Sequence, residues 1–250
     1  MRLLLSALML VALALPARAQ APITIVVNFA AGGSADRMAR LLAPEMTETL
    51  GAQVVVKNTT GASGAIGAAE VARARPDGHT LLLTTVGPVA IQPSFRSDLP
   101  YRPADLVPVC QVGDAPLVLM TTPASGIRDV AGLLQRARTV PGGINYGSVG
   151  PGSLPHIAMA ALVQQTGVPM THVPFRGSSE AVIALMRDDV SLYSDLPGAV
   201  RINNLVAIGV AAERRAPEFP DVPTMREQGV DLVTSIWAGL FATAGTPPAT

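Results

Sequence analysis

Short hydrophobic runs alternate along the chain with stretches in which hydrophobic residues recur every three or four positions. The runs have the length of buried β-strands: Ile23–Val27, Val54–Val56, Leu81–Thr85, Leu117–Thr121, Ile144–Ser148, Met170–Val173, Ser191–Ser194 and Leu205–Val210. Helical spacing occurs between them: Met38, Leu41, Leu42, Met46 and Leu50; Val130, Leu133 and Leu134; Val182, Leu185 and Met186. This alternation predicts an α/β fold in which mostly parallel sheets are flanked by helices.

The longest hydrophobic run lies at the N-terminus. Arg2 supplies a positive charge, the segment Leu3–Leu15 is almost wholly apolar, and Ala17-Arg18-Ala19 has the A-x-A form of a cleavage site. The run is shorter than the roughly 20 residues that a membrane span requires. We therefore expect residues 1–20 to be a secretory signal peptide, so that the mature protein is exported and soluble.

Composition argues against several classes of protein. With 49% hydrophobic and 14% charged residues, the chain lacks the composition of a disordered protein. Lys+Arg and Asp+Glu both total 18, and this zero net charge argues against a nucleic-acid partner. The mean hydropathy of +0.39 is attributed to the N-terminal run and to the core.

The rare reactive residues predict no metal site and no cofactor. Cys110 is the one cysteine of the chain, and its valine neighbours indicate a buried strand thiol. The three histidines, His79, His156 and His172, are too widely separated for metal-ligand spacing. No dinucleotide-binding G-x-G-x-x-G motif or P-loop is found in the two glycine-rich loops described below.

The length beyond residue 20 predicts two lobes, because about 230 residues exceed a typical domain. Breaks rich in proline and glycine lie at Pro123–Gly126 and at Pro217–Pro223. We expect residues 21–122 and 226–250 to form lobe 1 and residues 123–225 to form lobe 2, with a ligand cleft between them. No internal sequence repeat is apparent.

Two glycine-rich loops of similar design carry the candidate chemistry. Phe29–Asp36 links the first strand to the first helix, and Gly147–Ser153 leads into a helix that begins near Leu154. The N-terminus of a helix presents unpaired N–H groups and the positive end of the helix dipole, which together form an anion site. One loop from each lobe could therefore bind the same carboxylate, with Gly33 and Gly152 facing each other. We expect Gly33 to adopt a turn that a β-branched residue cannot.

Other interpretations of these loops stay open. Both loops could be tight strand-to-helix turns in which Ser153 caps one helix and Asp36 complements the dipole of another. A third glycine cluster, Asn58–Gly67, could face the same cleft or form a close contact between a helix and a sheet. The alternative function is a Ser/His/Asp hydrolase.

In that hydrolase, Ser148 or Ser153 would be the nucleophile, His156 the base and Asp195 the residue that orients it. Neither serine lies in a G-x-S-x-G nucleophile elbow. No catalytic residue is therefore assigned.

A series of motifs follows in order along almost the whole chain beyond residue 20. They are Phe29-Ala-Ala-Gly-Gly-Ser-Ala-Asp36, Val54–Asn58, Gly61–Gly64, Arg75–Thr80, Leu99–Tyr101, Tyr146–Ser153 with His156, His172–Gly177, Phe219–Thr224, Trp237–Leu240 and Gly245–Pro247. In this order they resemble the substrate-binding proteins of tripartite tricarboxylate transporters, also called the Bug family.

The resemblance implies a periplasmic two-lobed binding protein of the type II kind, which closes on a small organic carboxylate. The positions that match the family's ligand loops are Phe29, Ala31, Gly32, Gly33 and Asp36 in one lobe and Ser148, Gly152, Ser153 and His156 in the other. The positions expected near the distal end of the ligand are Thr84, Thr85, Gly87 and Asp195.

The resemblance also implies a partner, a two-component membrane permease with a large and a small subunit, energised by an ion gradient. We expect a monomer that needs no cofactor and catalyses no reaction. Some relatives present their ligand to a sensor protein instead, and this role stays open.

The chain departs from the family pattern at three places. Asn28 and Ala31 stand where proline is more frequent, and Asp188-Asp189 stands where two glycines are usual. In the family, the segment around Gly245–Thr250 is followed by further helices that close the first lobe. We therefore expect this chain to be a C-terminally truncated member.

Overall fold

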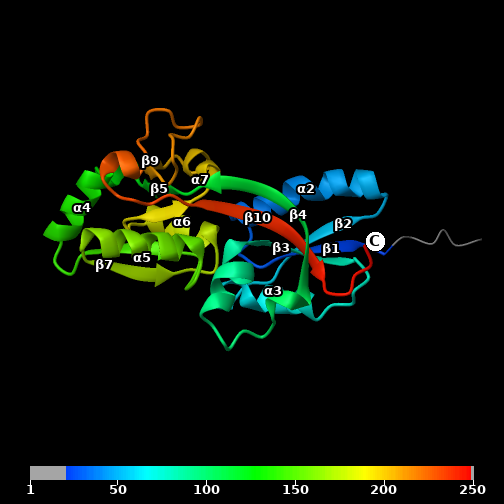
Figure 1. The fold of residues 1–250 in the computed structure, drawn as a ribbon. Helices are drawn as coiled ribbons and strands as arrows, with labels where there is room; N and C mark the ends of the chain where they lie inside the picture. Colours follow the sequence, from blue (N-terminus) through cyan, green and yellow to red (C-terminus); the bar gives the residue numbers. More distant parts are fainter. Residues whose placement is uncertain (1–20, 249–250) are drawn as a thin grey trace, which may run out of the picture.

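Two bodies, each a sheet covered by helices, lie side by side in the computed structural model, which describes residues 21–248 (Figure 1). The predicted signal peptide, residues 1–20, lies outside the described residues. The first half contains α2 (Ser34–Leu50) and α3 (Ala65–Ala72). Its five-stranded sheet has the order β2 (Val54–Asn58), β1 (Ile23–Val27), β3 (Thr80–Thr85), β10 (Ser235–Thr243) and β4 (Leu106–Pro116).

The second half repeats this plan. Its strands are β5 (Val118–Thr121), β6 (Ile144–Ser148), β7 (Met170–Pro174), β8 (Tyr193–Asp195) and β9 (Val206–Val210). Its helices are α4 (Val130–Thr139), α5 (Leu154–Thr166), α6 (Ser178–Met186) and α7 (Pro197–Ile202). Short helical turns complete the two halves: η1 (Ala62–Gly64), η2 (Gly87–Ile91), η3 (Gln92–Ser94), η4 (Pro103–Asp105), η5 (Pro123–Ser125) and η6 (Arg226–Gln228).

The two halves share one strand order. In the second half, β6 pairs with β7, while β5 pairs with β8 and β9. These two sheets join where Tyr146 bridges Leu192, and the Gly147 N–H donates to the Leu192 carbonyl at 2.8 Å. The order β7-β6-β8-β5-β9 therefore matches β2-β1-β3-β10-β4 position by position.

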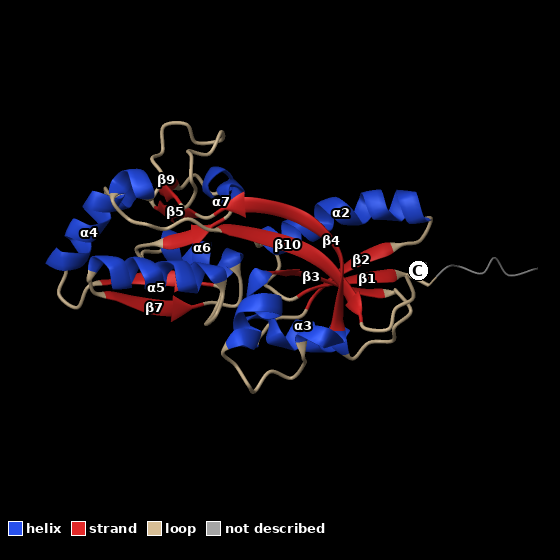
Figure 2. Ribbon diagram, in the orientation of Figure 1, coloured by secondary structure: helices blue, strands red, loops and turns tan. Residues whose placement is uncertain are grey.

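The α/β prediction is confirmed, and the hydrophobic runs explain the layers of the first half. Ile25 and Val27 of β1 pack with α2 on one face of the sheet, whereas Val26 packs with α3 on the other face. A strand buried on both faces appears in sequence as a continuous apolar run. Figure 2 shows the two helices on opposite sides of the red strands.

The sheets are mixed, because the strands that connect the halves enter them antiparallel. β1 runs parallel to β2 and β3, and β6 runs parallel to β7. In contrast, β10 is antiparallel to β3 and β4, and β5 is antiparallel to β8 and β9. β4 and β10 are the long arrows that extend toward the second half in Figure 2.

Strand pairing favours lobe boundaries slightly different from those predicted at residues 123 and 225. β5 pairs within the second half although it ends at Thr121, before the predicted boundary at Pro123. Val230 and Leu232 likewise pack in the core of the second half. We therefore propose that the chain crosses at Leu117 and returns near Thr234.

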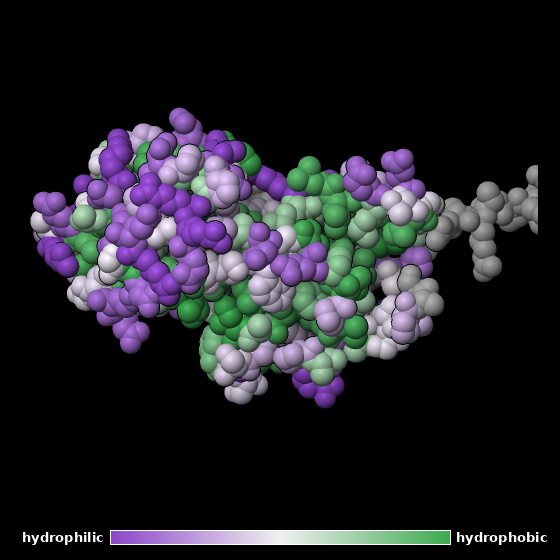
Figure 3. All heavy atoms as spheres, turned by 45° about the horizontal axis from the view of Figure 1, so that its top comes forward, coloured by the Kyte–Doolittle hydropathy of each residue, from purple (hydrophilic) through white to green (hydrophobic). Residues whose placement is uncertain are grey.

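Part of the apolar character lies on the surface. β4 is an edge strand, and Val107, Val109 and Cys110 are exposed on it. The expectation of a buried Cys110 is therefore wrong, since β4 is the outermost strand of its sheet among residues 21–248. On the face shown in Figure 3, apolar side chains gather over the half on the right, and the other half is mostly hydrophilic. Within residues 21–248, no helix has the length and hydropathy to cross a bilayer.

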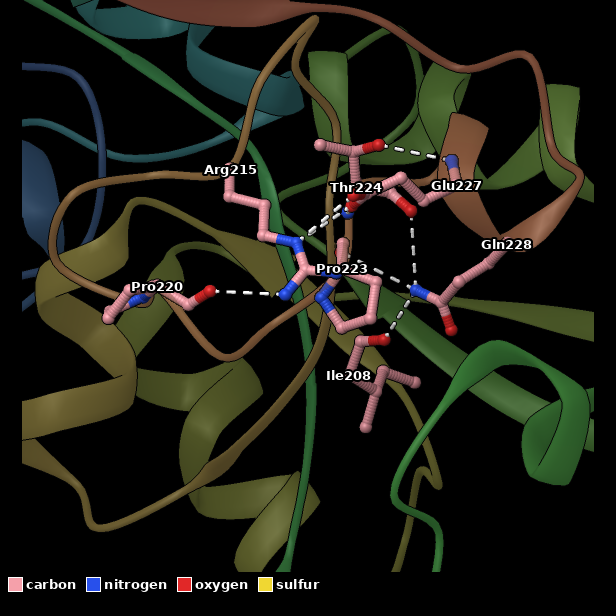
Figure 4. Close-up of polar contacts among 7 residues, drawn as sticks. All are labelled: Ile208, Arg215, Pro220, Pro223, Thr224, Glu227 and Gln228. Atoms are coloured by element: carbon pink, nitrogen blue, oxygen red, sulfur yellow. Dashed lines mark hydrogen bonds and ion pairs between the residues drawn. The ribbon is translucent and has the colours of Figure 1, made fainter.

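A polar network fastens the long segment between β9 and β10 to the second half (Figure 4). The Thr224 N–H donates to Glu227 at 2.6 Å, Glu227 N–H donates back to Thr224 Oγ1 at 3.1 Å, and Arg215 pairs with Glu227 at 3.0 Å. Gln228 forms hydrogen bonds to residues distant in the sequence. Its Nε2 donates to the Ile208 carbonyl at 2.9 Å, and its Oε1 accepts from the Val130 N–H at 2.8 Å. This one side chain thus joins η6, β9 and the first turn of α4.

We predict that Gln228→Ala lowers the free energy of unfolding by about 2 kcal/mol, because the backbone groups of two buried residues, Val130 and Ile208, lose their partner. Urea unfolding followed by circular dichroism measures the change. Gln135→Ala, at an exposed position of α4, is the matched control and should change stability by less than about 0.5 kcal/mol. Equal effects of the two substitutions would contradict the proposed role of Gln228.

Candidate ligand-binding site

A cavity lies between the two halves, where the parallel strands of both sheets end. Phe29 follows β1, Thr85 ends β3, Val149 follows β6 and Asp195 ends β8, and all four residues line the cavity. In open α/β sheets, ligands bind at this carboxyl end of the strands. The cavity has a volume of about 30 Å³. The structure thus brings Phe29, Thr85 and Asp195 together with Gly33, as predicted for four of the site residues.

The N-termini of two helices, one from each half, meet at this cavity. α2 begins at Ser34 and α6 begins at Ser178, and neither helix has a side-chain cap. Both serines line the cavity, and a Cβ added to Gly33 would lie 3.4 Å from the Ser178 nitrogen. Within residues 21–248, the N–H groups of Ser34 and Ala35 have no hydrogen-bond acceptor. Two positive helix ends therefore converge on one space, an arrangement that favours an anion.

The terminus of α6 was not predicted as part of the site. The expected partner of Gly33 was Gly152, but the structure places Ser178 opposite Gly33. Gly152 lies against a different neighbour, since a Cβ added to it would lie 2.6 Å from the ring of Phe95. The sequence signal for the α6 terminus was Gly177 followed by two serines after a strand. This pattern is that of a simple strand-to-helix junction, so it did not stand out as a binding site.

The glycines of the first loop shape the backbone more than they offer free donors. The Gly32 N–H donates to Asp36 Oδ2 at 2.8 Å, and the Gly33 N–H donates to the Ala30 carbonyl at 3.3 Å. Gly32 has the left-handed conformation, with φ of +75°, whereas Gly33 has an ordinary φ of −77°. The expected reason for glycine at position 33 was therefore wrong: an added Cβ would lie 3.2 Å from the Ala30 carbonyl oxygen and 3.4 Å from Ser178, so a side chain there would be crowded.

Asp36 is buried and holds this loop in place. Besides Gly32, it accepts hydrogen bonds from Arg40 Nε at 2.8 Å and from Asn58 Nδ2 at 3.0 Å. Burial alone would raise the pKa of Asp36, but these donors outweigh it and hold the pKa below its usual value. Asp36 was predicted to bind the ligand, but it does not line the cavity; its bonds position the loop instead.

Two further predicted residues, Thr84 and Ala31, form hydrogen bonds that hold together the segments around the cavity. Thr84 is buried, and its Oγ1 accepts from Asn28 Nδ2 at 2.9 Å, which ties the end of β3 to the end of β1. The Ala31 carbonyl accepts from the Ser179 hydroxyl at 2.8 Å. Because Ser179 belongs to α6, this bond joins the two halves.

The second predicted loop is held from within in a similar way. Ser148 Oγ accepts from the Gly150 N–H at 3.0 Å, and the Gly152 N–H donates to His156 Nδ1 at 3.2 Å. Ser153 caps α5 by accepting from the His156 N–H at 3.4 Å. The cavity is lined by other residues of this region, Val149 and Pro155.

Gly87, after β3 of the first half, lies next to the second predicted loop. A Cβ added to it would lie 3.4 Å from the Gly152 carbonyl oxygen, so position 87 lies directly against the second loop. Gly87 does not line the cavity itself.

Asp195 is the acidic residue of the cavity. Its Oδ2 accepts from the Ser34 and Tyr193 hydroxyls, both at 3.1 Å, and its Oδ1 accepts from the Leu196 N–H at 2.8 Å. Burial raises the pKa of Asp195 above its usual value, although the surrounding donors act in the opposite direction. Ser34 lies in the first half, so its bond to Asp195 spans the cleft.

The Ser/His/Asp set of the alternative hydrolase is not assembled. Ser148 lies 2.6 Å from the ring nitrogen of His172, not from His156, and Ser153 caps a helix. Among the described residues, Asp195 bonds to hydroxyl and amide donors and to no histidine. Without a carboxylate to orient the base, this pair lacks the arrangement of a catalytic triad.

The two histidines behind the second loop are neutral at ordinary pH. The rings of His156 and His172 contact each other at an interplanar angle of 32°, with centroids 4.2 Å apart. Burial, with a contribution from His156, lowers the pKa of His172 to about 4, and burial also lowers the pKa of His156. A neutral His156 is required here, because a protonated ring could not accept from the Gly152 N–H.

We predict that acid weakens the fold through His172. The unfolded chain binds a proton at this residue below about pH 6.5, whereas the folded chain binds it only near pH 4. The free energy of unfolding therefore falls as the pH is lowered between these values. His172→Phe should lose less stability than the wild type between pH 6.5 and 4.5, as measured by urea unfolding. Equal losses in both proteins would contradict the role of His172.

The fold and this cavity define a two-lobed ligand-binding protein, and comparison with known sequences specifies its family. The model of the "Tripartite tricarboxylate transporter family receptor" family matches residues 38–250. A UPF0065 protein from the tcbD-tcbE intergenic region of Pseudomonas sp. (strain P51) is 40% identical over 235 residues, covering 90% of this chain and 69% of that protein. Protein BugT of Bordetella pertussis is 37% identical over 240 residues, covering 93% and 73%. The chain belongs to the tripartite tricarboxylate transporter receptor family.

Solved structures agree with this assignment. MatC (Rpa3494) from Rhodopseudomonas palustris, with bound malate, has a TM-score of 0.84 and 34% identity, covering 91% of this chain and 80% of MatC. Rpa4515 of R. palustris with adipate has a TM-score of 0.86 and 32% identity, covering 91% and 78%. The periplasmic binding protein BugD has a TM-score of 0.85 and 33% identity, covering 91% and 78%. The two-lobed fold predicted from the sequence is confirmed.

Proposed function

We propose that this chain is a periplasmic receptor that binds a small organic carboxylate between its lobes and delivers it to a two-component membrane permease. The observation that carries the proposal is the convergence of the uncapped α2 and α6 N-termini on one cavity. The structures of MatC with malate and of Rpa4515 with adipate support a carboxylate as the ligand. The receptor acts as a monomer, without cofactor or catalysis.

In this proposal the predicted residues divide into two groups. Phe29, Gly33, Thr85 and Asp195 line the cavity and contact the ligand. The remaining predicted residues hold the loops that shape the cavity: Ala31, Gly32, Asp36, Thr84, Gly87, Ser148, Gly152, Ser153 and His156. The ligand carboxylate accepts from the N–H groups of Ser34 and Ala35, with the α6 terminus opposite.

Backbone donors suit a receptor that must release its cargo. A hydrogen bond between an N–H group and a carboxylate is worth about 1.5–3 kcal/mol, so a few of them give useful affinity without a buried cationic clamp. The aromatic side chain of Phe29 and the nearby Val149 and Pro155 exclude water from the cavity. Closure of the lobes around the ligand also changes the surface that a permease meets.

We predict that Ser34→Pro weakens carboxylate binding at least about tenfold relative to Ser34→Ala. Both variants lack the hydroxyl, but only proline also removes the N–H at the first position of α2. Proline is tolerated at this position, and the preceding Gly33 already has the extended conformation that proline requires. Titration calorimetry with succinate, malate and adipate measures the dissociation constants.

Thermal unfolding of both variants checks that the fold is intact. Equal dissociation constants for Ser34→Pro and Ser34→Ala would contradict binding at the α2 terminus. Failure of the folded wild type to bind any carboxylate of a broad panel would contradict the proposed function itself.

We also predict that carboxylate binding strengthens as the pH is lowered. The raised pKa of Asp195 means that its carboxyl group takes up a proton at a higher pH than an ordinary aspartate. Protonation removes a negative charge beside the bound carboxylate, so affinity rises on acidification. Asp195→Asn should bind with weaker pH dependence in the same titrations. An unchanged pH dependence in that variant would exclude Asp195 as the titrating group.

A further inference from the structure

A second pocket lies beside the cavity, at the junction of α2 and α6. It has a volume of about 180 Å³ and is lined by the same Gly33, Ser34 and Ser178 that line the cavity. Its other polar lining includes Arg37, Ser179 and Asn203. The two spaces therefore share one wall, which consists of the helix ends that receive the first carboxylate in the proposed function.

Arg37 is exceptional among the arginines that the structure describes. Only Arg37 and Arg96 are less than about one-third exposed, and Arg96 pairs with Asp98 at 2.9 Å. Arg37 has no ion pair, and its side chain has no hydrogen bond within residues 21–248. A partly buried arginine side chain without an anionic partner is costly wherever burial removes water that would otherwise solvate its charge.

The helix geometry directs Arg37 toward the second pocket. Arg37 lies one turn after Gly33, so their backbones are about 6 Å apart along the axis of α2. Side chains on a helix lean toward its N-terminus, and Arg37 accordingly lines the pocket together with Gly32, Gly33 and Ser34. Arg37 therefore borders the same space as Ser34, the first residue of that helix.

The acidic residues near this pocket do not neutralise Arg37. Asp114 and Glu218 line a groove that Arg37 also borders, but neither is within ion-pair distance of it. Asp195 is engaged by Ser34, Tyr193 and Leu196. Asp36 lies on the same helix, but its pair is with Arg40.

We propose that the pocket at Arg37 is a second anion subsite, which binds the far carboxylate of a dicarboxylate whose near carboxylate lies at the α2 terminus. This inference rests on the proposed function and adds to it a residue that determines specificity. Arg37 offers a planar set of donors that matches a carboxylate, and its charge complements the second anionic group. A ligand with a single carboxylate leaves the subsite empty and gains nothing from Arg37.

The test compares dicarboxylates with monocarboxylates of the same chain length: succinate with butyrate, glutarate with pentanoate, and adipate with hexanoate. Calorimetry of the wild type should show one dicarboxylate binding at least about tenfold more tightly than its monocarboxylate partner. Arg37→Gln should weaken that dicarboxylate at least about tenfold and change the monocarboxylate less than about twofold. Arg37→Lys keeps the charge but not the planar donors. Its affinity for that dicarboxylate should lie between those of the wild type and Arg37→Gln.

Arg187→Gln is the matched control, because Arg187 is exposed and its side chain has no hydrogen bond or ion pair among the described residues. It should bind every compound as the wild type does, and thermal unfolding verifies that all variants are folded.

Three results would overturn the subsite: equal affinity of the wild type for both members of every pair, an equal loss for both members in Arg37→Gln, or no loss in that variant. In each of these cases binding of a carboxylate persists, so the proposed function stands. If the folded wild type bound no member of either series, the proposed function and the subsite would fail together.

Discussion

The buried carboxylate of Asp36 is the constraint on which the site depends. It accepts from the Gly32 N–H, from Arg40 and from Asn58, so it joins the first loop, α2 and the end of β2. Since Asp36 turns back to the loop, it does not cap its own helix, and the first N–H groups of α2 stay available. The same bond allows the left-handed turn at Gly32 that directs the chain into the helix. A residue that never touches the cavity thereby determines what the cavity can bind.

The repetition of one strand order in both halves explains why the site forms between them. In each half, a parallel strand ends, a loop follows, and a helix begins with its positive end toward the cleft. Placed face to face, two such halves direct several strand ends and helix termini at a common space. No cationic side chain is needed for the first anion, which agrees with a chain whose single lysine, Lys57, pairs with Glu70 on the surface.

Much of this arrangement was predictable, because local signals determine it. The apolar runs of β1 and β3 are buried on both faces. Phe29 and Asp195, which the family resemblance placed at the ligand, line the cavity where strands end. Contacts between distant segments were not predictable. The strand β10 carries glycine and serine and shows no simple period, and it is defined by its pairing with β3 and β4. The bond between Ser148 and His172 and the approach of Ser178 to Gly33 likewise depend on how the chain folds back, and spacing in the sequence does not encode it.

The exposed edge of β4 has a practical consequence for studying this receptor. The chain has one cysteine, and Cys110 presents its thiol to solvent on a strand that lies outside the cavity lining. A thiol-reactive fluorophore would therefore attach at a single defined place without disturbing the core or the ligand. Since β4 pairs along its length with β10, the strand that returns from the second half, a dye at this position sits on the connection between the lobes. Fluorescence of a label on Cys110 can therefore report movement of the lobes without any engineered cysteine.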